Sequence, residues 1–170
     1  MVKGLRVKWG SCSRTVSLDD TPRTLACWKD VVAIGCDPGD IIILGAVTQT
    51  RISVHSGHTA SVRSLTLSSD GVLLASGSDD ETVKSWDIQT GGVVRTFCGH
   101  TGRVRSVSIS LDHTTIASGS DDWTIRLWDT QTGECRHVID EHRNTVNSVD
   151  LSPANSQLLM SASKDHTVQQ

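Results

Sequence analysis

Four short runs rich in branched apolar residues follow one another in the middle of the chain. Ser, Asp and Gly separate the runs, which span residues 62–67, 72–76, 82–86 and 92–97. Branched residues in short runs favour β-strands, and the intervening residues supply turn geometry. The pattern predicts four consecutive strands that pair as an antiparallel meander, and no stretch has a competing helical period.

The same pattern recurs at a spacing of 42 residues. His58, His100 and His142 lie 42 residues apart, and the Trp-Asp pair that starts at Trp86 recurs at Trp128. A single unit of this size cannot bury its own apolar face, so neighbouring copies must stack to form a core. The sequence therefore predicts an all-β array of four-stranded units, with two full units at residues 57–98 and 99–140.

The flanking segments follow the same spacing less closely. Residues 141–170 form an incomplete third unit, in which the spacing predicts a one-residue insertion at 155–157. Residues 21–56 form a degenerate unit, whose Ile-rich stretch at 32–44 is expected to be held by apolar packing. In the N-terminal segment 1–20, the stretch 14–18 is expected to be a lone strand on the outside of a neighbouring unit.

The Gly-His pairs, the Ser-Gly-Ser-Asp-Asp turns and the Trp-Asp pairs resemble those of the WD-repeat β-propeller family. The resemblance implies blades of four antiparallel strands, about four of them here, in an incomplete arc of a larger ring. It also implies hydrogen-bonded tetrads that give each buried imidazole nitrogen and each indole N–H a partner. These tetrads are His58, Ser76, Asp80 and Trp86; His100, Ser118, Asp122 and Trp128; and, in part, His142, Ser161 and Asp165.

The degenerate unit has no such tetrad, because Ile34, Pro38 and Leu44 stand at the positions of Ser, Asp and Trp. The chain also ends one residue before the position of a third signature Trp. This predicts a fragment of a longer propeller, which self-associates through its open blade edges. The alternative is closure of the ring in cis or in trans, by pairing of residues 14–18 with 167–169.

Partner-contacting side chains in the WD-repeat family sit three and five residues after the tetrad His and one before the tetrad Asp. Arginine and aspartate at such positions would form a mixed-charge rim for a protein partner, with arginine as the anchor. A solvated rim whose charges compensate one another is the alternative. The positions are Ser61, Arg63 and Asp79; Arg103, Arg105 and Asp121; Thr145, Asn147 and Lys164; and, in the degenerate unit, Asp19, Thr21 and Asp37.

The motif Trp-Asp-x-Gln-Thr-Gly, which starts at both Trp86 and Trp128, is similar to that of the C-terminal WD repeats of fungal NACHT-type heterokaryon incompatibility receptors. This resemblance implies a recognition module, the sensor part of an NLR-like protein. The broader family resemblance implies a non-catalytic scaffold that binds a protein. An enzyme with its site in the central channel of the propeller is the alternative.

No catalytic, cofactor or metal site is predicted. The His, Ser and Asp residues could suggest a hydrolase triad, but a catalytic constellation has no reason to recur once per repeat at one spacing. Asp79 and Asp121 lack the loop of alternating ligands that an EF-hand needs, and are expected to face solvent. Five cysteines without a Cys-x-x-Cys pair predict reduced, mostly buried thiols rather than zinc or disulfides.

Composition adds little to the choice of partner. The 170 residues carry 16 basic and 19 acidic side chains, a formal net charge of −3. No apolar run approaches the length of about 18 residues that indicates a membrane span. The expected partner is therefore a protein rather than a nucleic acid or a membrane, and the expected location is the cytoplasm or the nucleus.

Overall fold

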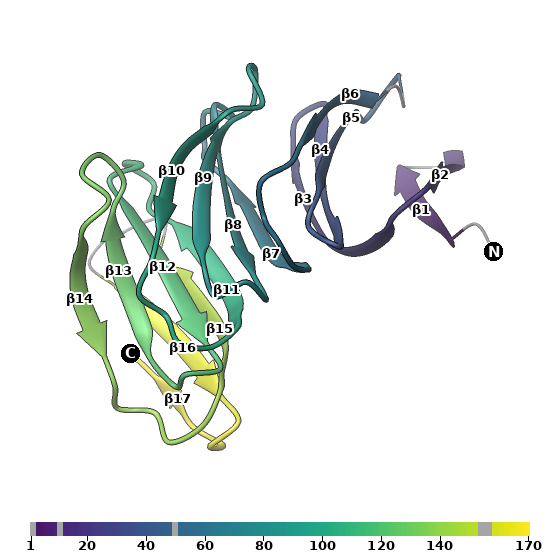
Figure 1. Ribbon diagram of the computed structural model, residues 1–170. Helices are drawn as coiled ribbons and strands as arrows, with labels where there is room; N and C mark the ends of the chain where they lie inside the picture. The colour runs from purple at the N-terminus through teal and green to yellow at the C-terminus, as the bar shows by residue number, and fades with distance from the viewer. Residues whose placement is uncertain (1–2, 10–11, 49–50, 153–157) are drawn as a thin grey trace.

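The computed structural model describes residues 3–9, 12–48, 51–152 and 158–170. A two-stranded hairpin is followed by four antiparallel sheets, which stack in chain order as blades 1 to 4 of an open arc (Figure 1). The hairpin consists of β1 (Lys3–Trp9) and β2 (Cys12–Leu18). Blade 1 consists of β3 (Thr21–Trp28), β4 (Val31–Asp37), β5 (Ile41–Gly45) and β6 (Arg51–His55). Blade 2 consists of β7 (Val62–Leu67), β8 (Leu73–Ser78), β9 (Val83–Asp87) and β10 (Val93–Phe97). Blade 3 consists of β11 (Val104–Ile109), β12 (Thr115–Ser120), β13 (Ile125–Asp129) and β14 (Cys135–Ile139), and blade 4 of β15 (Val146–Leu151), β16 (Leu159–Ser163) and β17 (Val168–Gln169).

Aspartate side chains shape the turns that join these strands. Between the first two strands of blade 2, Asp70 accepts hydrogen bonds from the Ser68 hydroxyl and from the backbone N–H of Val72. Between the last two strands, Asp87 accepts from both the backbone N–H and the hydroxyl of Thr90. Such side-chain bonds let short polar residues stand in for backbone partners, which is why the predicted turn residues end each strand.

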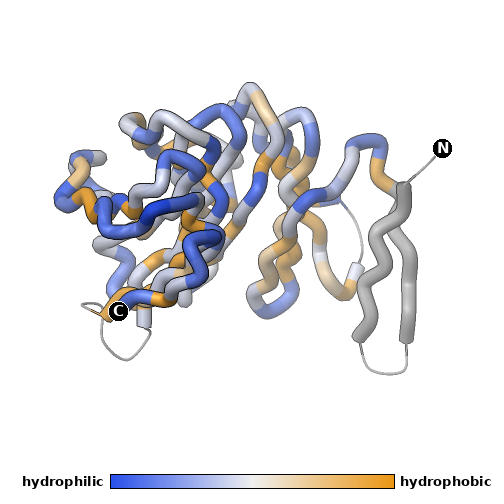
Figure 2. Tube along the Cα trace, turned by 90° about the horizontal axis from the view of Figure 1, so that it is seen from below, coloured by the Kyte–Doolittle hydropathy of each residue, from blue (hydrophilic) through white to orange (hydrophobic). Residues whose placement is uncertain are grey.

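Much of the core lies between neighbouring blades. Trp86 of blade 2 packs in one apolar cluster with Ala33 and Ile41 of blade 1, and Trp128 of blade 3 packs with Val83 and Phe97 of blade 2. Figure 2 shows the apolar positions recurring along the strands, with hydrophilic stretches at many of the turns. Each blade therefore depends on its neighbours for burial, as expected for a repeat array.

The first strands of successive blades lie side by side and are joined by serine hydroxyls. Ser64 Oγ accepts a hydrogen bond from the backbone N–H of Val107, and Ser106 Oγ accepts one from Val149, both at 3.1 Å. Close approach also requires a glycine in the second strand. A Cβ added at Gly77 would lie 2.5 Å from the side chain of Val104, so a side chain there would push blade 3 away.

Blade 1 is a complete four-stranded sheet that has apolar side chains at the positions of the tetrad Ser and Trp. Ile34, Ile42 and Leu44 are buried in one cluster, and all five residues of β5 are buried. The apolar side chains that replace the Ser and Trp of the other blades therefore fill the same space by packing. The predicted insertion at 155–157 lies outside the described residues.

Three expectations are wrong. Residues 14–18 are not a lone outer strand, because they belong to β2 and pair with β1 along its whole length. Val168 and Gln169 pair with β16, at the end of the arc opposite the hairpin (Figure 1), so these two segments do not close a ring within the chain. The cysteines are not mostly buried either, since Cys27 and Cys98 are exposed and Cys135 is partly exposed. Among the described residues no helix is long and apolar enough to cross a membrane.

Candidate functional site: the blade tetrads and the interaction rim

In blade 2 the predicted His, Ser, Asp and Trp form one chain of hydrogen bonds. His58 Nδ1 lies 2.7 Å from Asp80 Oδ2, and His58 Nε2 lies 2.7 Å from Ser76 Oγ. The indole N–H of Trp86 donates to the same serine oxygen at 2.7 Å. The carboxylate accepts a hydrogen bond from Nδ1–H. This leaves Nε2 to accept a hydrogen bond from the serine hydroxyl.

Blades 3 and 4 repeat this geometry. In blade 3, His100 lies 2.7 Å from both Asp122 Oδ2 and Ser118 Oγ, and Trp128 donates to Ser118 at 2.8 Å. In blade 4, His142 Nδ1 lies 2.8 Å from Asp165 Oδ2, and His142 Nε2 lies 2.8 Å from Ser161 Oγ. The histidine side chains are almost fully buried. Three buried copies with matching distances mark a structural network that ties the loop before each blade to its second and third strands.

The tetrad aspartates also hold the tight turn in which they sit. Asp122 accepts hydrogen bonds from the backbone N–H of Thr101 and from both the backbone N–H and the hydroxyl of Thr124. Burial raises the pKa of the Asp122 carboxyl, but the hydrogen bonds from His100 and Thr124 outweigh it and leave the pKa well below its ordinary value of 3.8. The same balance lowers the pKa of Asp80. Both carboxylates therefore stay ionised at neutral pH.

Acid should unfold the blades through these aspartates. A carboxyl whose pKa is lowered by folding contributes stability above its unfolded pKa, and that contribution is lost as the pH falls through the lower, folded value. The urea midpoint of the chain should therefore fall steadily below about pH 4. Asp122→Asn removes one such carboxylate, so its midpoint should fall less steeply over this range. Equal slopes for the variant and the wild type would contradict the prediction.

Two of the rim arginines, Arg63 and Arg105, lie on β-bulges at the start of blades 2 and 3. The pairing of β7 with β8 shifts register between Val62 and Ser64, so Arg63 bulges out of the ladder, and Arg105 does so between Val104 and Ser106. A bulge re-aims a side chain. Here it directs each guanidinium at the aspartate of its own blade.

Each of these arginines forms a two-pronged ion pair. Arg63 donates to Asp79 through Nε at 2.8 Å and through Nη2 at 2.6 Å, and Arg105 donates to Asp121 through the same two nitrogens at 2.8 Å. Hydrogen bonds from Arg105 lower the pKa of Asp121. Paired geometry of this kind is stronger and more rigid than a single contact.

Ser61, Arg103 and Thr145 are the first residues of the three rim sets, and each contacts the turn that holds the rim residue of its own blade. The backbone N–H of Asp79 donates to the carbonyl of Ser61, and that of Asp121 donates to the carbonyl of Arg103, both at 2.9 Å. Arg103 Nε also lies 4.0 Å from Asp79 Oδ1 of the preceding blade. A side-chain hydrogen bond from Thr145 likewise reaches Asp121 of the preceding blade and lowers its pKa. Arg103 thus connects Asp79 of blade 2 with Asp121 of blade 3.

The structure changes which rim residues face solvent. Ser61 and Thr145 are buried, although they occupy the same position as Arg103. Asp79 and Asp121 do not simply face solvent as expected, since their arginine partners leave their side chains 14% and 24% exposed. The side chain of Arg103 is 56% exposed, and Asn147 and Lys164 are exposed.

Two further rim residues, Arg23 and Trp123, are not predicted by the spacing of the repeat. Arg23, not Thr21, is the counterpart of Arg63 in blade 1, since it bulges between Pro22 and Thr24 and pairs with Asp37 at 3.0 Å. Its spacing from Arg63 is two residues shorter than the period, so a fixed ruler misses it. Trp123, directly after a tetrad aspartate, is 52% exposed with a φ of 74°. An aromatic residue where the other copies have Glu81 and His166 was the signal for it.

Comparison with known proteins agrees with this geometry. The family model of the WD domain, G-beta repeat, matches residues 49–87, 91–129 and 133–170, which is more than half of the chain. Each matched segment contains the last strand of one blade and the first three strands of the next. A sequence repeat therefore spans two blades, and each copy covalently joins neighbours that also share a core.

Some individual proteins share a segment of about one repeat with this chain. Proteins described as ribosome biogenesis protein BOP1 homologs, from Drosophila virilis and Drosophila melanogaster, are 54% identical to this chain over 43 residues. That segment is 25% of the chain and 6% of either relative, so the chain matches only a small part of their length. No cluster of metal-binding side chains occurs in the part of the chain that the structure describes. The three family matches, together with the hydrogen-bonded tetrads that they contain, show that this chain belongs to the WD-repeat family.

Proposed function

We propose that this chain is a non-catalytic recognition module that binds a protein partner on its rim. The observation that carries the proposal is the row of rim side chains at the same end of blades 2, 3 and 4. Backbone hydrogen bonds of 2.9 Å place Asp79, Asp121 and Lys164 beside the first strand of their own blades in the same way. A rigid frame that presents different side chains at equivalent places is suited to recognition.

The rim offers both an aromatic anchor and cationic side chains. Trp123 and Arg103 are the most exposed of the large side chains that we place on the rim of blades 2 and 3. Tryptophan and arginine carry much of the binding energy in protein interfaces. The rim aspartates already accept hydrogen bonds from Arg63 and Arg105. A partner with an apolar pocket for Trp123 and carboxylates for Arg103 would therefore complement this surface best.

Substitution of Arg103 or Trp123 on the rim should weaken capture of the partner. Arg103→Glu, and separately Trp123→Ala, should lower the amount of each specific partner retained from a cell lysate by about tenfold or more. Quantitative mass spectrometry of the captured proteins measures this. Arg136→Glu is the matched control, because Arg136 pairs with Asp129 at the opposite end of β13 from Trp123. Partners retained equally by all four proteins would contradict the rim as the binding surface.

The wider context of the module is also part of the proposal. The Trp-Asp-x-Gln-Thr-Gly motif that recurs in its repeats supports a sensor role in a fungal NLR-like receptor of the cytoplasm. The Drosophila relatives are named for ribosome biogenesis, which would favour the nucleus, but the shared 43 residues amount to one repeat. A tagged chain in fungal cells tests this: concentration in the nucleolus would contradict the receptor role, and an ATPase segment in the same gene would support it.

A further inference from the structure

Three positions around each tetrad aspartate have the same backbone geometry in blades 2, 3 and 4. The residue after the tetrad His donates its backbone N–H to the tetrad Asp, at 3.0, 3.0 and 2.9 Å. The residue before the tetrad Asp donates to the carbonyl of the first rim residue of its blade at 2.9 Å, and the residue after it donates to a serine carbonyl at 3.3 Å. Side chains at these positions are therefore presented at equivalent places in the three blades.

The charges at these positions change from one blade to the next. Two rim aspartates are partly covered by their arginine partners, and the other side chains in the three sets are exposed. In the same order, the sets are Thr59, Asp79 and Glu81 in blade 2; Thr101, Asp121 and Trp123 in blade 3; and Arg143, Lys164 and His166 in blade 4. Blade 2 thus has acidic side chains at places where blade 4 has basic ones.

Ion pairs with the first strands neutralise the two rim aspartates. Arg63 and Arg105 each form a two-pronged pair with the rim aspartate of their own blade. The equivalent residue of blade 4 is the neutral Asn147, and Lys164 stands at the position of the rim aspartates. Of these three positions, Glu81 therefore carries the exposed charge of blade 2, whereas the exposed charges of blade 4 are basic.

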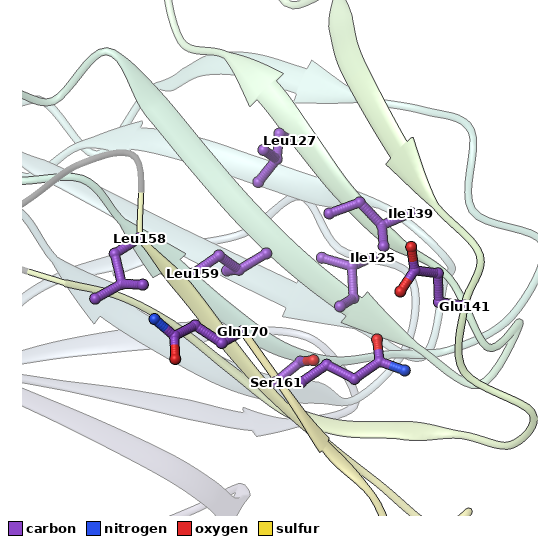
Figure 3. Close-up of a pocket in the computed structure, with 9 residues that line it drawn as sticks. Ile125, Leu127, Ile139, Glu141, Leu158, Leu159, Ser161 and Gln170 are labelled. Carbon is purple, nitrogen blue, oxygen red and sulfur yellow. The ribbon is translucent and has the colours of Figure 1, made fainter.

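The basic side chains of blade 4 are not neutralised by the acidic residue closest to Arg143 in the sequence. That residue is Glu141, and Figure 3 shows it on the lining of a groove between blades 3 and 4, with Ile125 and Ile139. Among the described residues, no ion pair involves Glu141, Arg143 or Lys164. The basic groups of this blade are therefore available to a partner.

The residues after the tetrad aspartates have a backbone conformation that favours glycine. The φ angle is 68° at Glu81, 74° at Trp123 and 69° at His166. A residue with a Cβ is strained in this conformation. Burial does not offset the strain, because all three residues are exposed. Strain that persists in exposed side chains is a mark of functional positions.

The three blades present these side chains on one continuous surface. The hydrogen bond from Arg105 lowers the pKa of Asp121, and the charge of Lys164 in the next blade lowers it further. The hydrogen bond to Asp79 raises the pKa of Arg63, and the charge of Asp121 in the next blade adds to this effect. Charges of blades 2, 3 and 4 thus act on one another, and the blades follow one another in space (Figure 1).

We infer that the rim binds an extended protein segment with charges of opposite sign at its two ends, an inference that rests on the proposed function. A basic side chain of the segment pairs with Glu81, and an apolar one covers Trp123. Acidic side chains pair with Arg103, Lys164 and Arg143. The charge order of the rim fixes the direction in which the segment lies, because the reverse direction places like charges together.

Random dodecapeptides displayed on phage, selected on the immobilised 170-residue chain and then sequenced, test the inference. Enriched peptides should have basic residues toward one end, an apolar residue between, and acidic residues toward the other end. One direction of this order should be enriched over the reverse by about tenfold or more, since like charges repel in the reverse direction.

Charge swaps in the chain locate the two ends of the segment. Glu81→Lys should replace the basic residues of the enriched peptides by acidic ones and leave the other end unchanged. Lys164→Glu should replace the acidic residues by basic ones in the same way. Glu134→Lys is the matched control, because Glu134 is exposed and lies on the turn at the opposite end of β13 from Trp123.

Trp123→Gly separates a binding role from a structural one. Glycine adopts a φ of 74° without strain, so the urea midpoint of this variant should not fall. Retention of the enriched peptides should weaken by about tenfold or more. A lower midpoint with unchanged retention would overturn the role of this turn in binding.

Enriched peptides without an order of charges, or the same peptides from the wild type and both charge swaps, would overturn the inference. So would a selection that enriches no peptide. In each of these cases, capture of partners from a lysate that still depends on Arg103 and Trp123 would leave the proposed function standing. Loss of that dependence would contradict the proposed function itself, which keeps the two failures distinguishable.

Discussion

Trp128→Ala should lower the free energy of unfolding by about 3–5 kcal/mol, the largest effect expected in this chain. Trp128 is 1% exposed, contacts Phe97 with ring centroids 5.8 Å apart, and donates to Ser118. Removing the ring opens a cavity between blades 2 and 3 that the rigid strands on either side cannot close. Urea unfolding followed by circular dichroism measures the change.

Trp123→Ala is the matched control, because it removes the same side chain from the adjacent turn. Trp123 is 52% exposed, so its loss should change the free energy of unfolding by no more than about 0.5 kcal/mol. Trp128→Phe should fall between the two, since it keeps most of the packing and loses the hydrogen bond to Ser118. Similar urea midpoints for Trp128→Ala and Trp123→Ala would contradict the assignment of Trp128 to the core.

Asp122→Ala should lower the free energy of unfolding by about 3 kcal/mol, because it removes the acceptor of several hydrogen bonds at once, including that of the buried His100. His100 Nδ1, the backbone N–H of Thr101 and the hydroxyl of Thr124 all lose their acceptor. The cost of an unpaired buried polar group exceeds the net contribution of a typical hydrogen bond. Thermal and urea unfolding of the variant measure the effect.

The neighbouring residue provides the contrast. Asp121→Ala removes the ion pair with Arg105, whose side chain is 28% exposed, and should cost about 1 kcal/mol or less because water can solvate the guanidinium. The sequence predicts that Asp121 faces solvent. Its two-pronged pair with Arg105 instead makes a small but measurable loss of unfolding free energy the expected result. Equal destabilisation by the two adjacent substitutions would show that tetrad and rim do not differ in burial.

Much of the architecture follows from the periodic sequence. The 42-residue spacing of His58 and His100, and of the serine and aspartate that bond each of them, predicted a network that the structure shows atom by atom. A buried imidazole needs partners for both nitrogens, so every member of the network must recur together. The same reasoning predicted that blade 1, with Ile34 in place of serine, relies on apolar packing.

The rim was less predictable, because its exposure depends on the neighbouring blade. Ser61 and Thr145 occupy the same position as Arg103, yet both are buried, whereas Arg103 is exposed. Arg23 takes the role of Arg63 in blade 1 on a bulge that lies two residues closer than the period predicts. A fixed spacing assumes that each copy has the same length, and a two-residue offset violates that assumption.

The sequence by itself determined the all-β repeat, the order of its strands and the members of each tetrad, since these depend on local pattern and on the need to pair buried polar groups. The tertiary structure alone decided the pairing of residues 14–18 with β1, the exposure of Trp123 and the ion pairs that cover Asp79 and Asp121. These features arise from contacts between strands, which a pattern read along one strand does not contain.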